Sequence, residues 1–279
     1  MATNPAIDTL VRRAAVMRRI RAFFDTRGFI EVETPVRIPS PAPEPHIDCP
    51  PCGREFLRAS PELQMKKLLA AGMERIYQIG PCFRDGEKGR RHNPEFTMIE
   101  WYRRGEDDRA IAADLEALVD ELAPGHEPIL HLHVRDVYRE TAGWDPWESW
   151  DADRFDFDMA AKIEPNLPKG PLFLEGYPRE AAALAKIEGD TAARWEFYWQ
   201  GVELANCFTE LCDAAEQRKR FEAARAQRRD LGEADYPLDE EFLEILPEIG
   251  SAAGVALGID RLVMLLCGEN DISHVRAAC

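Results

Sequence analysis

The chain has no apolar run long enough to cross a membrane, and Met1–Thr9 lacks the basic start and apolar core of a secretory signal. It also has no internal repeat and no low-complexity tract. With 45% hydrophobic and 31% charged residues over 279 positions, its composition is that of a globular protein with a large core. These absences argue against a membrane protein and predict a globular protein of the cytoplasm.

Basic residues are scarce relative to acidic ones. The chain carries 35 Lys and Arg against 51 Asp and Glu, which gives a net charge of −16. Because Lys and Arg neutralise phosphates in nucleic-acid binding, this balance argues against a broad nucleic-acid surface. Five arginines near the start leave room for a local basic patch, but their spacing favours the solvated side of an amphipathic helix. They are Arg12, Arg13, Arg18, Arg19 and Arg21.

Cysteines are scattered along the chain. Seven is an odd number, which suits free thiols in a reducing compartment better than a disulfide framework. Cys49 and Cys52, with His46 nearby, are spaced like half of a zinc site, but a structural zinc needs four ligands and no second CxxC follows. We interpret them as loop cysteines, because Pro39–Pro51 is rich in proline.

The stretch 84–102, RDGEKGRRHNPEFTMIEWY, is the most informative part of the chain. Strand-like runs before and after its polar, glycine-bearing loop predict a hairpin with a long loop. Because side chains alternate along a strand, Phe96, Met98, Glu100 and Tyr102 share one face. A carboxylate and a phenol beside an aromatic ring are unusual in a hydrophobic core. We therefore interpret this face as the wall of a pocket. Arg84 lies where the loop begins, and its guanidinium group can make two parallel hydrogen bonds to a phosphate.

The rest of the chain alternates helical and extended patterns. Apolar spacing predicts helices over 10–27, 61–71, 107–122, 214–231 and 259–266, and strands over 196–210 and 254–257. The weakly patterned stretch 126–190, with three tryptophans among acidic residues, is predicted to be a helical insertion. This organisation suits an α+β fold with an antiparallel sheet, in one domain over 1–279.

Five ordered segments resemble the class II aminoacyl-tRNA synthetases, most closely the lysyl branch. They are GFIEVETP at 28–35, SPE at 60–62, the stretch 84–102, GVELANCFTEL at 201–211 and GVALGIDR at 254–261. Any one of them alone is a weak signal, whereas five in order cover most of the chain. The resemblance implies the class II catalytic fold, an antiparallel sheet flanked by helices. It also implies an enzyme that activates a carboxylate with ATP and Mg²⁺.

Activation of a carboxylate by ATP brings two anions together, so the site must neutralise phosphates and orient the reacting groups. Arg84 and Arg261 are the phosphate ligands and catalytic residues that the resemblance implies, and Arg261 begins a helix, where anions are favoured. His92, Asn93 and Phe96 match family positions that contact ATP, with Phe96 under the adenine. The resemblance also assigns to ATP the positions Asp85, Gly86, Glu87, Glu203, Leu204 and Gly258.

Glu196 and Glu203 lie on the two arms of a predicted hairpin that turns near Gly201. In either plausible register the two carboxylates come close together. Adjacent carboxylates favour a divalent cation or a shared proton, and exposed acids on a strand pair are the alternative in so acidic a chain. The resemblance assigns Mg²⁺ to Glu196 and Glu203.

The amino-acid pocket implied by the resemblance is acidic. Glu62, Glu100, Glu210 and Tyr102 match positions that hold the amino groups of lysine. Buried ammonium groups need carboxylates to offset their desolvation, so this set suits a substrate with two ammonium groups. Ala256 stands where tRNA-charging enzymes tend to have Gly, which is consistent with an altered backbone such as that of a β-amino acid. The other pocket positions are Ser60, Pro61, Asn206 and Phe208.

The chain departs from the family pattern at three places. Gly86 stands where an acid is usual, Cys207 replaces a Gly, and the end of the chain lacks the usual Phe-containing tail. In addition, only Met1–Leu10 precedes the first predicted helix, which leaves no room for the N-terminal OB-fold of lysyl-tRNA synthetases.

A free-standing core of this kind resembles the ligases that attach (R)-β-lysine to a lysine side chain of elongation factor P. The resemblance implies (R)-β-lysine or lysine as substrate, elongation factor P as acceptor, a homodimer formed through the helix and the strand that lead up to Pro35, and no stable binding of tRNA. Two alternatives stay open: a lysyl-type enzyme acting on another acceptor, and a synthetase-like regulator without catalysis. Retention of Arg84, Glu203, Glu210 and Arg261 argues against the regulator.

Overall fold

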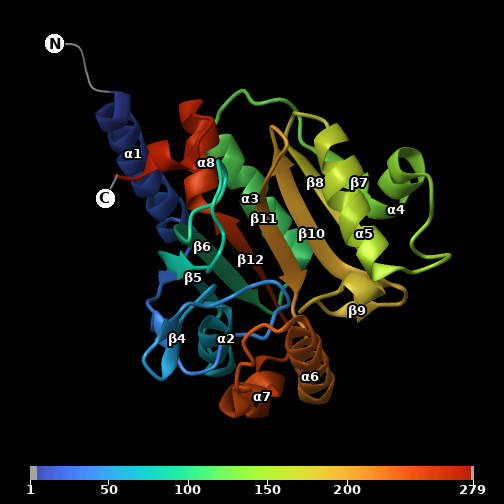
Figure 1. The fold of residues 1–279 in the computed structure, drawn as a ribbon. Helices are drawn as coiled ribbons and strands as arrows, with labels where there is room; N and C mark the ends of the chain where they lie inside the picture. The colour runs from blue at the N-terminus through green and yellow to red at the C-terminus, as the bar shows by residue number, and fades with distance from the viewer. Residues whose placement is uncertain (1–4, 278–279) are drawn as a thin grey trace. The chain divides into compact units, whose positions relative to one another are not determined.

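The computed structural model describes residues 5–277 of the chain (Figure 1). Contacts divide these residues into two compact units, and each unit combines strands with helices. Unit 1 comprises the described chain up to Gly105, Cys212–Gly250 and the stretch from Ala256, and unit 2 comprises Glu106–Leu211 and Ser251–Val255. The sequence predicted one domain. It does not reveal this division because each unit is assembled from segments that are far apart in the chain.

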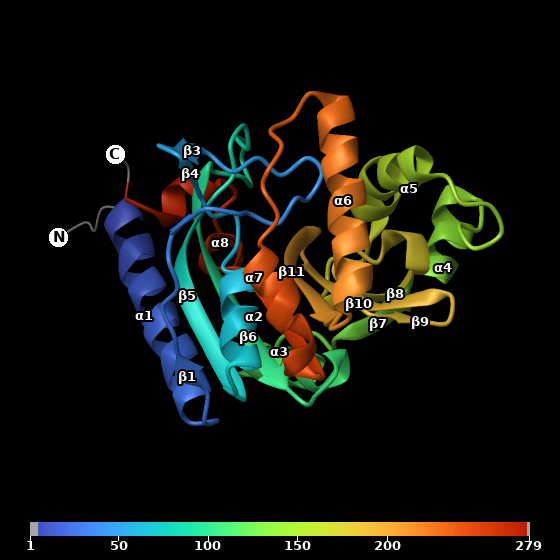
Figure 2. The ribbon, with the colours of Figure 1, turned by 90° about the horizontal axis from the view of Figure 1, so that it is seen from below.

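The main sheet of unit 1 is built on the hairpin predicted around the polar loop. Its strands are β1 (Ile30–Glu31), β5 (Arg75–Phe83) and β6 (Glu95–Arg104). β5 and β6 pair antiparallel, and β1 adds to β5 in parallel. Helix α1 (Pro5–Asp25) runs alongside β1 and β5 (Figure 2). The ring of Phe24 stacks on Tyr77 with centroids 4.9 Å apart and also meets Trp101, so aromatic packing fastens the helix to the sheet.

The other elements of unit 1 surround this sheet hairpin. They are the strands β2 (Arg37–Ile38), β3 (Pro51–Cys52) and β4 (Glu55–Leu57), the helices α2 (Glu62–Ala70), α6 (Ala214–Leu231), α7 (Glu240–Ile245) and α8 (Ile259–Cys267), and the 3-10 helices η5 (Leu246–Ile249) and η6 (Ile272–Val275). β2, β4 and β3 form a small antiparallel sheet. α6 begins and ends at the predicted residues because Asp213 caps its first turn and Gly232 adopts the left-handed conformation after its last.

The arginines of α1 do not all lie on its solvated side. Arg12, Arg18 and Arg19 are exposed, as predicted. Arg13 is mostly buried instead, with its guanidinium 2.6 Å from the Asp260 carboxylate and a hydrogen bond of 2.8 Å to Thr97 Oγ1. Arg13 therefore ties α1 to α8 and β6, a contact that the helical spacing does not reveal.

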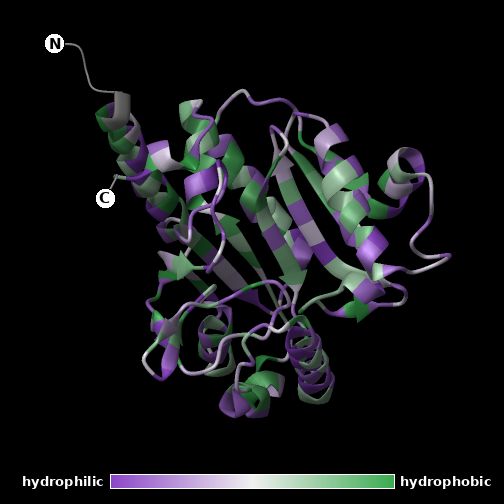
Figure 3. Cartoon of the chain, viewed as in Figure 1, coloured by the Kyte–Doolittle hydropathy of each residue, from purple (hydrophilic) through white to green (hydrophobic). Residues whose placement is uncertain are grey.

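Unit 2 is a mostly antiparallel sheet with helices packed on it. Its strands are β7 (Leu130–His133), β8 (Leu172–Pro178), β9 (Ile187–Glu188), β10 (Thr191–Trp199), β11 (Val202–Thr209) and the first part of β12 (Ala252–Gly258). β11, β10, β8 and β7 are neighbours in that order, with β9 paired to β10. Helix α3 (Asp108–Leu122) packs on β10 and β11. Hydrophilic and hydrophobic residues both occur along β10 (Figure 3), and residues 195–198 of this strand are all buried.

The stretch 126–190 is helical mainly in its middle, which corrects the expectation of a helical insertion over its whole length. Its helices are α4 (Val134–Val137), η1 (Tyr138–Ala142), α5 (Ala152–Asp158), η2 (Met159–Ile163), η3 (Glu164–Asn166) and η4 (Arg179–Ala181). The strands β7, β8 and β9 lie on either side of the helical part. Leu172 and Leu174 of β8 are fully buried against it, beside the stacked rings of Tyr138 and Phe155. The strands escaped prediction because they are short and their alternation is interrupted by aromatic and acidic neighbours.

Candidate active site

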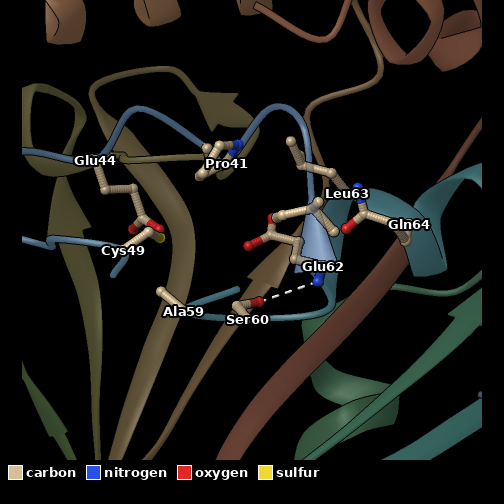
Figure 4. A pocket seen from close by; sticks show the side chains of 10 residues that line it. Pro41, Glu44, Cys49, Ala59, Ser60, Glu62, Leu63 and Gln64 are labelled. Atoms are coloured by element: carbon tan, nitrogen blue, oxygen red, sulfur yellow. Dashed lines mark hydrogen bonds between the residues drawn. The ribbon is translucent and has the colours of Figure 1, made fainter. Parts of the chain in front are cut away.

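Four of the predicted substrate-binding residues in unit 1 come together between the start of α2 and the strand β6. Ser60 precedes α2 and Glu62 opens it, while Glu100 and Tyr102 share one face of β6, as the alternation predicted. Ser60 Oγ donates to Glu100 Oε1 at 2.6 Å, and Tyr102 OH donates to Glu100 Oε2 at 2.7 Å. The Glu62 amide donates to Ser60 Oγ at 3.0 Å (Figure 4). Two hydroxyl groups therefore fix the carboxylate of Glu100.

The carboxylate of Glu100 has an unusual electrostatic environment. Its side chain is 1% exposed, and its hydrogen-bond donors are hydroxyls rather than cations. Burial and then repulsion from Glu62 raise the pKa of Glu100 to about 7, against the opposing hydrogen bonds of Ser60 and Tyr102. An ammonium group placed beside Glu100 would favour the ionised form, so this position suits a cationic substrate.

Glu62 already has an internal cationic partner. Lys66, one turn further along α2, places its Nζ 2.5 Å from Glu62 Oε1 and is itself 1% exposed. Glu62 also lines a small pocket. The wall of this pocket includes Glu44 and Cys49, which come from a preceding loop (Figure 4). Pro61, the chain neighbour of Ser60, is buried at the helix start.

A buried arginine holds the segment that carries Ser60 and Glu62. Arg58 is 1% exposed, and its Nη1 donates to Thr34 O at 2.9 Å, Thr34 Oγ1 at 2.8 Å and Pro35 O at 3.3 Å. Its Nε donates to Pro81 O on β5 at 3.2 Å. A Cβ on Gly80 would lie 2.6 Å from Arg58 Nη2, so only glycine leaves room for the guanidinium. Arg58 thus joins the end of the 28–35 segment, β5 and the substrate segment.

Arg84 is positioned for a ligand at the mouth of the predicted loop. Its Nε is buried without a hydrogen-bond partner among the described residues, and its Nη1 is 3.5 Å from Glu87 Oε1. Its guanidinium carbon lies 5.2 Å from the centre of the half-buried Phe96 ring. A buried donor without a partner costs free energy, and a phosphate oxygen would satisfy it.

Arg261 approaches the same loop from the first turn of α8. Its Nε donates to Arg91 O at 3.2 Å, and its Nη2 lies 2.6 Å from His92 Nε2. Burial and then the neighbouring Arg261 lower the pKa of His92, which keeps the ring neutral and able to accept this hydrogen bond. Gly258 is the N-cap residue of α8. The structure therefore brings Arg261, His92 and the loop that follows Arg84 together within unit 1.

The other predicted ATP positions shape the loop. The Asp85 amide donates to Asp48 O at 2.7 Å, and Asp85 Oδ1 accepts from the Gly86 amide. Gly86 has φ of 77°, a left-handed conformation that explains why glycine replaces the usual acid here. Asn93 is half-buried near the end of the loop, and Ala256 is half-buried on β12.

In unit 2, Arg194 on β10 organises three of the predicted residues. Its Nε donates to Asn206 Oδ1 at 3.2 Å, its Nη2 pairs with Glu196 Oε1, and its guanidinium lies 5.7 Å from the Phe208 ring centre. It also stacks on Tyr177 at 4.3 Å. Of the other predicted residues in this unit, Leu204 is buried on β11, and the Glu210 amide donates to Ala252 O.

The predicted hairpin of Glu196 and Glu203 is present, with its turn at Gln200 and Gly201. Glu196 pairs with Asn206 and Tyr198 pairs with Glu203, across an irregularity in the ladder. Burial raises the pKa of Tyr198 most, and the charges of both carboxylates raise it further, so both lie near the Tyr198 hydroxyl. The oxygens of Glu196 are nevertheless engaged, one by Arg194 and one by the Tyr198 hydroxyl at 2.8 Å.

The remaining expectations concern metals, thiols and membranes. Cys49 is buried in a loop and Cys52 ends β3, and burial raises the pKa of the Cys49 thiol to about 11. The six cysteines of residues 5–277 are free thiols. Across the same residues, no three His, Cys, Asp or Glu side chains are arranged to hold a metal ion. Every helix in this part of the chain is too short or too polar to cross a lipid bilayer.

Sequence reasoning missed three cationic residues that position the predicted ones, namely Arg58, Lys66 and Arg194. Two of them had a usable signal in their spacing. Lys66 lies four residues after Glu62 on a predicted helix, and Arg194 lies two residues before Glu196, just ahead of the predicted strand, so each shares a face with its partner in the structure. Arg58 had no such signal, because its partners are backbone groups elsewhere in unit 1.

The sequence matches the family model described as tRNA synthetases class II (D, K and N) over residues 2–277. The chain belongs to this family, which confirms the predicted α+β class II fold. Proteins named elongation factor P--(R)-beta-lysine ligase are similar to it over almost their whole length. The relative from Histophilus somni (strain 2336) is 36% identical over 98% of this chain and 95% of its own. The relative from Vibrio cholerae serotype O1 is 37% identical with the same coverage.

Proposed function

We propose that the chain is an ATP-dependent ligase that activates (R)-β-lysine as an adenylate and transfers it to a lysine side chain of elongation factor P. The observation that carries this proposal is the similarity to the elongation factor P ligases over 98% of the chain. The buried carboxylate of Glu100 supports a cationic amino acid as substrate. The unsatisfied donor of Arg84 supports a phosphate ligand.

The chemistry proceeds in two steps. A carboxylate oxygen of the amino acid first attacks the α-phosphorus of ATP, and pyrophosphate leaves. Arg84 and Arg261 offset the negative charge that gathers on the phosphates. The acceptor amine, once deprotonated, then attacks the carbonyl carbon of the adenylate, and AMP leaves. A neutral amino acid in the pocket would leave Glu100 without its cation, a penalty that selects against it.

Intact-mass spectrometry tests the proposal. Purified protein is offered ATP, (R)-β-lysine, elongation factor P and tRNA together, and the factor should gain one β-lysyl unit. Label on tRNA and not on the factor would overturn the proposal. Pyrophosphate exchange with α-lysine alone would support a lysyl-type enzyme with another acceptor, and no exchange with either amino acid would support a regulator.

The carboxylates of unit 2 are the proposed site for Mg²⁺. Both oxygens of Glu196 already accept hydrogen bonds, one from Arg194 and one from Tyr198. Binding at Glu196 would require it to exchange one of these partners. When bound, the ion neutralises phosphate charge on the nucleotide.

Replacing Glu203 by Gln should abolish pyrophosphate exchange while leaving the fold intact, because a half-buried strand residue loses only its charge. The exchange rate at several Mg²⁺ concentrations is the measurement. Glu188→Gln is the matched control, since the Glu188 side chain is 62% exposed and pairs with Lys186 on the surface of the same unit. Full activity in the Glu203 variant would contradict the metal assignment.

We further propose a cytoplasmic homodimer formed through α1 and β1. The exposed apolar side chains Ile7, Val11 and Ile30 lie on these elements, and an isologous contact would cover them on both copies. The free cysteines suit a reducing compartment. Stable tRNA binding is not expected at a net charge of −16. Sedimentation at micromolar concentration should give a dimer, and a monomer there would refute the interface.

A further inference from the structure

Lys66 is a buried cation next to Glu62, one of the carboxylates predicted to bind the ammonium groups of the substrate. Its side chain is 1% exposed, and its Nζ lies 2.5 Å from Glu62 Oε1. Surface pairs of this spacing on a helix stabilise it by only a few tenths of a kcal/mol, so helix stability does not explain a buried lysine, whose ammonium loses its hydration. A fixed internal ammonium group beside a predicted ligand of the substrate's ammonium group points to a role in recognition.

The charges around Glu100 explain what this role can be. Repulsion from Glu62 is the second largest influence on the Glu100 carboxylate, after its burial. Arg58 acts in the opposite direction, but more weakly than the hydrogen bonds of Ser60 and Tyr102. A cation fixed on Glu62 reduces that repulsion. Lys66 and Glu62 together carry no net charge, so Glu100 is the carboxylate that remains for an incoming ammonium group.

We propose that Lys66 is a specificity-determining residue that neutralises Glu62, so that Glu100 stays available to the ammonium group of the substrate. The inference rests on the proposed function in taking the substrate to be a cationic amino acid. Without Lys66, the full charge of Glu62 would act on Glu100 and raise its pKa further above about 7, so that Glu100 would be mostly protonated at neutral pH. A protonated Glu100 offers no charge to the substrate and distinguishes poorly between a diamine and its neutral isostere.

Lys66→Met keeps the length of the side chain and removes its charge. The KM for the cationic amino acid in pyrophosphate exchange should rise about fivefold at pH 7, with kcat little changed, because a one-unit rise from a pKa of about 7 lowers the ionised fraction of Glu100 from about one half to about one tenth. The midpoint of kcat/KM against pH should move about one unit to higher pH. The preference for lysine or β-lysine over norleucine should fall. If Lys66 had only a structural role, the variant would have a lower free energy of unfolding and a lower kcat, and the midpoint of kcat/KM against pH would not move.

Two further variants separate charge from packing. Glu62→Gln combined with Lys66→Met removes both charges, so the pH midpoint should return toward that of the unmodified protein, even though Glu62 itself contributes to binding. Lys67→Met is the matched control, because the neighbouring lysine pairs with Asp239 and Glu241 instead. For Lys67→Met, the midpoint of kcat/KM against pH should be unchanged. A midpoint that does not move in Lys66→Met, or is not restored in the double variant, would overturn the proposal.

The same proposal can also be tested on the ligand-free protein. Carboxyl-carbon NMR of the ligand-free protein should show Glu100 titrating at higher pH in Lys66→Met and at nearly the original pH in the double variant. If no amino acid supports exchange in the unmodified protein, the proposed function fails. The NMR titration then still decides whether Lys66 controls the charge of Glu100.

Discussion

Replacing Arg58 by Met lowers the free energy of unfolding by about 3 kcal/mol or more, the largest stability loss expected from a single change near the site. The guanidinium is 1% exposed and donates to Thr34 O, Pro35 O and Pro81 O as well as to a hydroxyl. Met fills much of the same space but leaves these buried carbonyls without donors. Urea unfolding followed by circular dichroism measures the change.

Arg37→Met is the control for this experiment. Arg37 is 62% exposed and pairs with Glu55 on the small sheet of the same unit, so its loss should cost no more than about 0.5 kcal/mol. Gly80→Ala should resemble Arg58→Met, because the new Cβ would lie 2.6 Å from the guanidinium. An Arg58 variant that unfolds at the same urea concentration as the unmodified protein would show that Arg58 does not hold the substrate segment.

The parts of the fold that could be predicted are those whose ends are marked locally. The helix 214–231 was predicted to the residue because Asp213 caps it and Gly232 stops it. The hairpin around Arg84 was predicted because long alternating strands flank a polar loop. β7 to β9 lack such signals, and the division into two units depends on contacts between distant segments, which no local pattern records.

The candidate site shows the same limit. Alternation along β6 correctly placed Glu100 and Tyr102 on one face, and the structure joins them by a hydrogen bond. Their buried supports were missed, because Arg58 bonds to carbonyl groups rather than to side chains that sequence reasoning could pair with it. The pKa of Glu100 could not be predicted either, since it depends on complete burial and on the distance to Glu62.

Replacing Arg84 by Met lowers the rate of pyrophosphate exchange by about 10²–10³-fold, the largest loss of activity expected from one arginine, because a charged donor is removed from the phosphates in the transition state. Stability should change little. The Nε of Arg84 has no hydrogen-bond partner among the described residues, and its contact with Glu87 is 3.5 Å long. Removing it therefore eliminates an unsatisfied buried donor rather than a strong internal bond. Steady-state exchange and urea unfolding of the same preparation measure both quantities.

Arg90→Met is the control from the same loop, because Arg90 is exposed and its side chain is not assigned to ATP. Its exchange rate should stay close to that of the unmodified protein. Arg84→Lys should recover only part of the activity, since an ammonium group is a point charge and cannot offer two parallel hydrogen bonds to a phosphate. Exchange at the original rate in Arg84→Met would exclude Arg84 as a phosphate ligand. If the variant lost both exchange activity and free energy of unfolding, Arg84 would be a structural residue. The two measurements together therefore distinguish a phosphate ligand from a residue that stabilises the fold.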